Sequence, residues 1–114
     1  MYDSENIFAK ILRKDIESSL IFENDYAIAF NDIMPSAPIH VLIIPKGEFI
    51  DYADFIKNAS AVQMSEYFAA ITKVAEKLNI QDYRLLTNNG AGVGQTVFHF
   101  HMHLLAGKEM SEVL

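Results

Sequence analysis

The chain has 114 residues, of which 51% are hydrophobic and 21% charged, and this composition predicts one folded domain spanning residues 1–114. It contains no cysteine, which excludes disulfide bonds, thiolate metal sites and a thiol nucleophile. The formal net charge is -6. Because general nucleic-acid binding depends on many Lys and Arg contacts to phosphates, we expect no nucleic-acid partner.

No apolar stretch reaches the roughly 18 residues that a bilayer-spanning helix requires. The first residues also lack the basic region leading into an apolar segment that is typical of a signal peptide. We therefore expect a cytoplasmic protein with no membrane partner.

In chain order, the first predicted element is a short helix from Ser4 to Arg13, with Ser4 as its N-cap. Residues 20–23 and 26–31 predict two strands that form a hairpin around the turn Asn24-Asp25. Residues 32–38 contain two prolines and predict a loop. The next stretch, 40–45, is rich in β-branched residues and predicts a strand.

Residues 61–78 predict the longest helix, which Asn79 can end. Its expected apolar stripe consists of Val62, Phe68, Ile71, Val74, Ala75 and Leu78. Residues 83–87 predict a strand, 88–94 a glycine-rich loop, and 97–105 the last strand. This order predicts an α+β fold, in which one long helix packs on a face of a mainly antiparallel sheet.

The predicted last strand contains three of the four histidines of the chain, at positions 99, 101 and 103. Residues two apart in a strand share a face, so these rings would project from one side about 7 Å apart. The other side would face the core with Phe98, Phe100, Met102 and Leu104. On pattern alone the histidines could be ordinary structural residues, metal ligands, or groups for nucleophilic and acid–base catalysis without metal.

The loop before the histidines favours catalysis. Gly90, Gly92 and Gly94 allow backbone N–H groups to approach a phosphate closely. Side-chain donors beside the loop are Asn88, Gln95 and Thr96. A glycine-rich loop alone usually indicates a flexible connection, but here it would place a phosphate next to a nucleophile.

Two residues outside this region are further candidates. His40 begins a strand and by itself would be an ordinary strand-end residue. Asp32 has no obvious charge partner in its loop, so its carboxylate could accept hydrogen bonds from ribose hydroxyls. Equally, Asp32 could satisfy its own backbone in a turn.

Two segments resemble a known family. Residues Gly94 to Leu105 resemble the histidine triad (HIT) motif, His-x-His-x-His followed by two apolar positions. Residues Asn31 to Lys46 are similar to the central segment of the histidine triad nucleotide-binding branch, often called Hint. The two motifs occur in the right order and at the right separation, and the match extends across nearly the whole chain.

The resemblance implies a HIT-like fold, a five-stranded antiparallel sheet with one long and one short helix. It also implies a homodimer in which two sheets join into a continuous larger sheet. The implied activity is hydrolysis of nucleoside 5'-phosphoramidates, with an AMP or GMP moiety, through a nucleotidyl-histidine and without a cofactor. Two alternatives are a dinucleoside polyphosphate hydrolase and a nucleotide-binding or protein-interaction module with incidental catalysis.

By the same resemblance, His101 is the nucleophile, and His99, His103 and His40 surround it and handle protons. The implied nucleotide-binding residues are Asp32 at the ribose, Ile33 at the base, and Asn88, Gly94, Gln95 and Thr96 near the phosphate. Many relatives hold zinc with a C-x-x-C pair near the N-terminus. Here those positions are Asn6 and Ala9, so we predict no metal.

Overall fold

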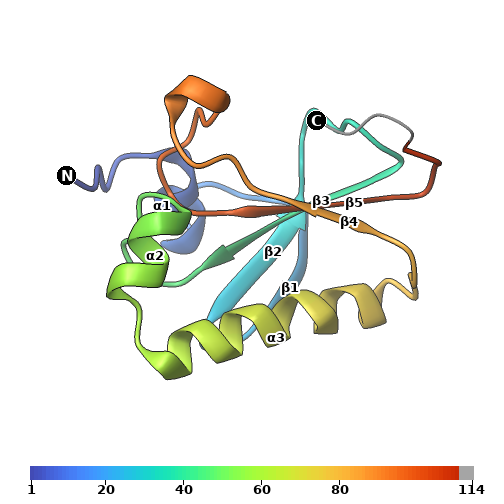
Figure 1. The fold of residues 1–114 in the computed structure, drawn as a ribbon, viewed down its shortest axis with the longest axis horizontal. Coiled ribbons are helices and arrows are strands. Elements are labelled where there is room, and N and C mark those ends of the chain that lie inside the picture. The colour runs from blue at the N-terminus through green and yellow to red at the C-terminus, as the bar shows by residue number, and fades with distance from the viewer. Residues whose placement is uncertain (111–114) are drawn as a thin grey trace.

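The computed structural model describes residues 1–110 of the chain and places a single sheet at its centre (Figure 1). The strands are β1 (Leu20–Glu23), β2 (Ala27–Asn31), β3 (Ile39–Pro45), β4 (Arg84–Leu86) and β5 (Met102–Ala106). They pair antiparallel in the order β1-β2-β3-β5-β4. This confirms the predicted five-stranded antiparallel sheet, including the hairpin of β1 and β2.

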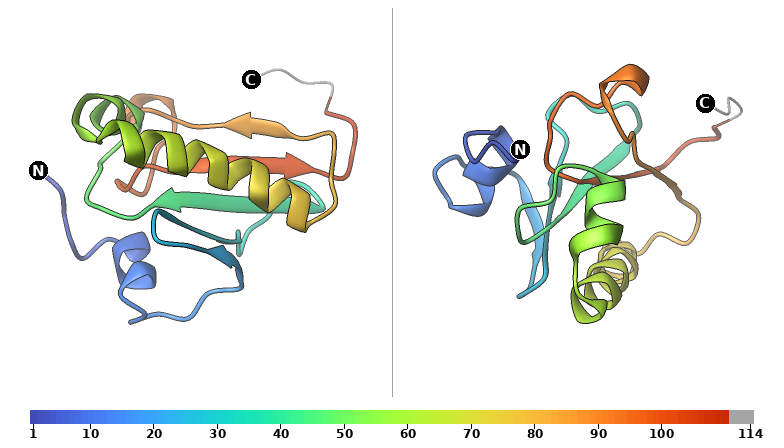
Figure 2. Two further views of the ribbon diagram at one scale, coloured as in Figure 1. Left: turned by 90° about the horizontal axis from the view of Figure 1, so that it is seen from below. Right: turned by 60° about the vertical axis from the view of Figure 1, so that its left-hand side comes forward.

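The helices lie on both faces of the sheet (Figure 2). They are α1 (Ile7–Leu12), α2 (Tyr52–Asn58), α3 (Ala61–Lys77) and a short 3-10 helix, η1 (Ala91–Val93). The sequence predicts neither η1 nor α2, because seven residues are too few for a clear apolar stripe in α2. Asp51 caps α2 by accepting a hydrogen bond from the backbone N–H of Asp54. Within residues 1–110, no helix has the length and apolarity to cross a bilayer.

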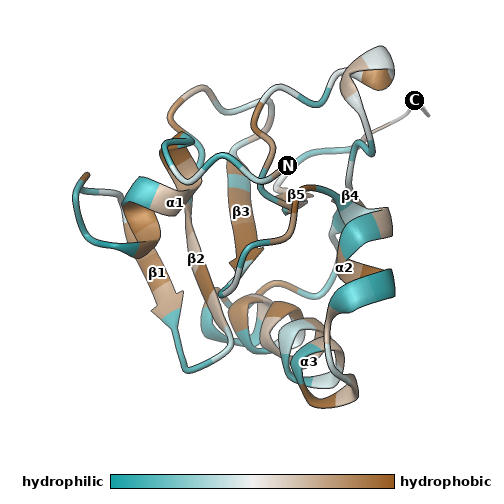
Figure 3. Cartoon of the chain, turned by 90° about the vertical axis from the view of Figure 1, so that its left-hand side faces the viewer, coloured by the Kyte–Doolittle hydropathy of each residue, from teal (hydrophilic) through white to brown (hydrophobic). Residues whose placement is uncertain are grey.

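The central strands β2 and β3 are buried on both faces, because their side chains alternate between two core clusters. Ala27, Ala29, Val41 and Ile43 face α3, while Ile28, Phe30, Leu42 and Ile44 face α1. Figure 3 shows the largely hydrophobic β3 between α1 and α2. The hydroxyl of Tyr67 in α3 donates to the carbonyl oxygen of Ile43 at 2.7 Å and ties that helix to β3.

The long helix α3 ends within one residue of its predicted boundary. Ser60 forms a capping box with Gln63, and Asn79 follows the helix with a φ of 56°. The predicted stripe is wrong at Val62 and Phe68, which are 56% and 39% exposed. The buried face has the i, i+3, i+4 spacing of a helix and consists of Tyr67, Ala70, Ile71, Val74 and Ala75.

The first helix begins later than predicted, and its cap is Asn6 instead of Ser4. The Asn6 side-chain oxygen accepts a hydrogen bond from the backbone N–H of Ala9 at 2.8 Å. Its amide nitrogen also donates to the carbonyl oxygen of Asp3 at 2.8 Å. Both residue types are good N-caps, and the local backbone places Asn6 three residues before an unpaired N–H.

The last strand is shorter than predicted, because pairing with β3 and β4 starts only at Met102 and His103. His99 and His101 therefore precede the ladder. The expected alternation holds for Phe100 and Leu104, which are buried in the α3-facing cluster. It is wrong for Phe98, which lies before the paired region and is 40% exposed.

We predict that Asn6→Ala lowers the free energy of unfolding by about 1 kcal/mol, because the first turn of α1 loses its cap. Urea denaturation measures this change. The matched control, Ser4→Ala, should change it by less than about 0.5 kcal/mol. Equal losses in the two variants would contradict the assignment of Asn6 as the cap.

Candidate functional site

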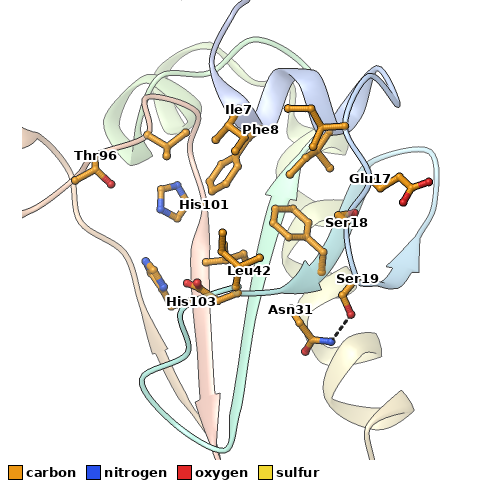
Figure 4. Close-up of a pocket in the computed structure, with 16 residues that line it drawn as sticks. Ile7, Phe8, Glu17, Ser18, Ser19, Asn31, Leu42, Thr96, His101 and His103 are labelled. Atoms are coloured by element: carbon orange, nitrogen blue, oxygen red, sulfur yellow. Dashed lines mark hydrogen bonds between the residues drawn. The ribbon is translucent and has the colours of Figure 1, made fainter.

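A cavity of about 360 Å³ opens between α1 and the sheet (Figure 4). Its apolar wall includes Ile7, Phe8, Ile11, Leu42 and Val97. His101 and His103 lie at one end of the cavity, and Glu17 and Ser18 lie toward the other. The shape therefore combines an apolar slot with a polar, imidazole-lined end, which is the usual form of a small-molecule site.

His101 is held through one ring nitrogen and leaves the other open. Its Nδ1 lies 2.7 Å from the carbonyl oxygen of His99, which can only accept, so Nδ1 carries the proton. Nε2 has no partner among the described residues and is the nitrogen available to the cavity. Burial lowers the pKa of His101 despite the opposing effect of the His99 carbonyl. The ring is thus neutral near pH 7, with a lone pair on Nε2.

A second pair of histidines lies beside it. The backbone N–H of Ser36 donates to Nδ1 of His40 at 2.9 Å, which places the proton of a neutral His40 on Nε2. That nitrogen lies 2.9 Å from Nδ1 of His103 and donates to it, so the proton of a neutral His103 lies on Nε2. The rings of His101 and His103 are 5.1 Å apart between centroids, closer than an extended strand predicts.

The position of Asp32 is compatible with both of its expected roles, as a turn residue and as an acceptor for ribose hydroxyls. One carboxylate oxygen accepts from the backbone N–H of Met34 at 2.8 Å, as in a turn. The other lies 3.4 Å from Nε2 of His40, and Asp32 is among the residues that line the cavity. Ile33, the next residue, also lines the cavity and is 89% exposed, so its apolar side chain is available at the rim.

Asp32, His40 and His103 are the one cluster of described residues whose ligand atoms lie close enough to hold a metal ion, within 4.8 Å of one another. The hydrogen bond from Ser36 argues against that use. A metal at Nε2 of His40 would require the proton to move to Nδ1, where it would oppose the N–H of Ser36.

His99 has no free ring nitrogen. Its Nε2 donates to the carbonyl oxygen of Pro45 at 2.9 Å, and its Nδ1 accepts from the hydroxyl of Tyr2 at 2.6 Å. The residue is fully buried, and burial lowers its pKa to about 4. His99 therefore contacts His101 through its backbone carbonyl oxygen, whereas the ring of His99 does not line the cavity.

The glycine-rich loop is closed by Gln95, which is 4% exposed. Its amide nitrogen donates to the carbonyl oxygens of Ile50 and Val97 at 2.8 and 3.0 Å. Its oxygen accepts from the backbone N–H of Gly90 at 2.8 Å. Gln95 thus holds the loop in shape, and its side chain is already engaged by the protein.

The other residues predicted near the phosphate differ in their surroundings. Thr96 is exposed and lines the cavity. Gly94 is exposed with a φ of 105°, a conformation that favours glycine. Asn88 is half-buried and is not among the residues that line this cavity.

Sequence reasoning missed the residues that hold the segment before β5. The hydroxyl of Thr87 donates to the carbonyl oxygen of His101 at 2.7 Å. The backbone N–H of Phe100 donates to the carbonyl oxygen of Phe49 at 2.8 Å. The only sequence signal for Thr87 is its place at the end of a predicted strand. No sequence pattern indicates the contact of Tyr2 with His99.

We predict that His99 and His103 stay neutral well below pH 6. Burial lowers the pKa of both to about 4, and for His103 the neighbouring His101 and His40 add to the effect. An unfolded histidine titrates near 6.5, so the unfolded chain binds more protons between pH ~6.5 and ~4. The free energy of unfolding therefore falls as pH decreases through this window. NMR titration of the ring protons measures the pKa values, and titration of His99 near 6.5 would contradict the analysis.

The chain matches the model of the HIT domain over residues 13–110. It is 45% identical over 112 residues to an uncharacterized HIT-like protein of Rickettsia prowazekii, covering 96% of this chain and 93% of that protein. It is 37% identical over 112 residues to the purine nucleoside phosphoramidase of Escherichia coli, with the same coverage of 96% and 93%.

Solved structures agree with these matches. A histidine triad protein from Clostridium difficile superimposes with a TM-score of 0.86 at 33% identity and covers 100% of both chains. A HIT family hydrolase from Clostridium thermocellum superimposes with a TM-score of 0.85 at 38% identity, covering 98% of each chain. The fold, the histidine positions and these matches lead to one conclusion: the chain belongs to the HIT domain family.

Proposed function

We propose that this protein hydrolyses purine nucleoside 5'-phosphoramidates, of the AMP-amine or GMP-amine type, through a nucleotidyl intermediate on His101. One observation supports this most directly. The Nδ1–H of His101 is bound to a backbone carbonyl while its Nε2 faces the cavity as a lone-pair donor. A neutral, oriented imidazole in a cavity of nucleotide size is suited to attack an electrophile.

In the first step Nε2 of His101 attacks the α-phosphorus, opposite the amine. The Nε2–phosphorus bond forms as the phosphorus–nitrogen bond breaks, and the amine leaves as it gains a proton. His103 is the neighbouring imidazole, and its Nε2–H can donate a hydrogen bond to a non-bridging oxygen. A neutral imidazole is too weak an acid to give up this proton, so the proton on the leaving nitrogen comes from solvent. His40 fixes this orientation of His103 from behind.

In the second step water attacks the phosphorus of the nucleotidyl-histidine. The phosphorus–Nε2 bond breaks, the attacking water releases a proton to solvent, and the nucleoside monophosphate leaves as His101 regains its lone pair. His99 takes no proton in this scheme, because both of its ring nitrogens are engaged elsewhere. We assign it to positioning instead of the proton handling that the family resemblance implies.

The rest of the cavity accommodates the nucleoside. Asp32 lines the cavity, and its carboxylate can accept hydrogen bonds from ribose hydroxyls. Phe8 and Ile33 offer apolar surface on which a purine ring can pack. The similarity to the purine nucleoside phosphoramidase of Escherichia coli supports this substrate class.

We predict that His101→Asn lowers phosphoramidate turnover by at least about a thousandfold while AMP binding survives, because the nucleophile is lost but the cavity remains. A coupled assay of amine release measures turnover, and calorimetry measures AMP binding. Near-normal turnover in the variant would show that His101 is not the nucleophile. Wild-type turnover should be unchanged after EDTA treatment, whereas a loss of turnover would support a metal-dependent enzyme.

We also propose a homodimer in which two sheets join. Strand β4 is an outer strand of the sheet, and Leu85 within it and Tyr83 beside it are 43% and 37% exposed. An unpaired strand edge with apolar side chains can pair with a second copy.

We expect light scattering of the wild-type chain to give twice the monomer mass. Leu85→Lys should shift the chain toward monomer, because it places a charge on the proposed interface. The matched control, Leu20→Lys, lies on β1 at the opposite edge of the sheet and should remain dimeric. A wild-type monomer would contradict the proposed assembly.

A further inference from the structure

The segment that holds His99 and His101 has no strand ladder to fix its backbone. Pairing of β5 begins at Met102, so the backbone of Phe100 and His101 depends on other contacts. Phe100 is held by the carbonyl oxygen of Phe49, and His101 by the hydroxyl of Thr87. A further anchor is the buried ring of His99.

The His99 ring is held from two sides. Pro45 at the end of β3 offers only a carbonyl oxygen, so the proton of His99 lies on Nε2. Its Nδ1 is then an acceptor that needs a donor inside the protein. Tyr2 supplies that donor at 2.6 Å, and its ring meets the imidazole edge-on with centroids 5.6 Å apart. Burial raises the pKa of Tyr2, which keeps its hydroxyl protonated and able to donate.

We propose that Tyr2 is a positioning residue for the nucleophile, because its hydroxyl locks the tautomer and orientation of His99, whose carbonyl oxygen in turn orients His101. The connection runs through two hydrogen bonds. The first joins the Tyr2 hydroxyl to Nδ1 of His99, and the second joins the His99 carbonyl oxygen to Nδ1–H of His101.

Loss of the Tyr2 hydroxyl leaves a buried ring nitrogen without its donor. An unpaired buried acceptor is unfavourable, so either a water molecule enters and donates to this nitrogen, or the His99 ring turns. Either response loosens the ring that fixes the backbone of His99. The carbonyl oxygen that holds His101 then moves, and a small displacement of a nucleophile is enough to slow an in-line attack.

The catalytic part of this inference rests on the proposed function, whereas the tautomer lock is a property of the folded protein alone. The test variant is Tyr2→Phe, which keeps the edge-on ring contact and removes only the hydroxyl. The matched control is Tyr26→Phe, in the turn between β1 and β2. Imidazole nitrogen NMR reports the tautomer of His99 without any substrate.

We expect Tyr2→Phe to lower kcat for an adenosine phosphoramidate about tenfold, while KM changes by less than about twofold. The Nδ1 resonance of His99 should move away from its hydrogen-bonded position, and Tyr26→Phe should change neither quantity. Wild-type kcat together with an unchanged His99 resonance would overturn the proposal. An inactive wild-type protein would contradict the proposed function alone, and the His99 resonance would still decide the role of Tyr2.

Discussion

The hydrogen bond from Nδ1–H of His101 to the carbonyl oxygen of His99 determines what the ring can do. It fixes the tautomer, so the lone pair lies on Nε2, and it fixes the direction in which that lone pair points. Burial keeps the ring neutral by lowering its pKa. A neutral imidazole with a lone pair on Nε2 therefore arises from one backbone contact and one desolvated position, provided that the backbone of His99 stays in place.

The fold satisfies that condition without a strand ladder. The backbone of a residue within a strand is held by its ladder, but His99 and His101 lie just before the paired part of β5. Their positions depend on contacts from Tyr2, Pro45 and Thr87, which come from distant parts of the chain. The central strands β2 and β3 support this arrangement, because they are buried on both faces and present Leu42 to the cavity.

Much of the fold could be predicted from the sequence, since strand alternation and helix periodicity are local signals. The hairpin at Asn24-Asp25 and the end of α3 near Asn79 follow from short-range turn and cap preferences. The N-cap of α1, Asn6, could not be chosen over Ser4, because asparagine and serine both cap helices well. The start of β5 depends on where the pairing with β3 and β4 begins, and no local sequence pattern predicts that position.

The candidate site shows the same division. Strand alternation and the family resemblance identify the histidines as candidate site residues. The structure places His101, His103 and His40 together with Asp32. The hydrogen bond from the side chain of Gln95 to the distant Ile50 could not be predicted from the sequence of the loop. Single hydrogen bonds between distant residues, such as that of Tyr2 with His99, leave no periodic trace in a sequence.

A crystal structure of the protein with bound AMP tests the central claim most directly. The account predicts that the phosphorus lies opposite Nε2 of His101, within about 3–3.5 Å, with Nδ1 still bound to the carbonyl oxygen of His99. A phosphate bound elsewhere, or an Nε2 turned away from the phosphorus or bound to a metal ion, would contradict it.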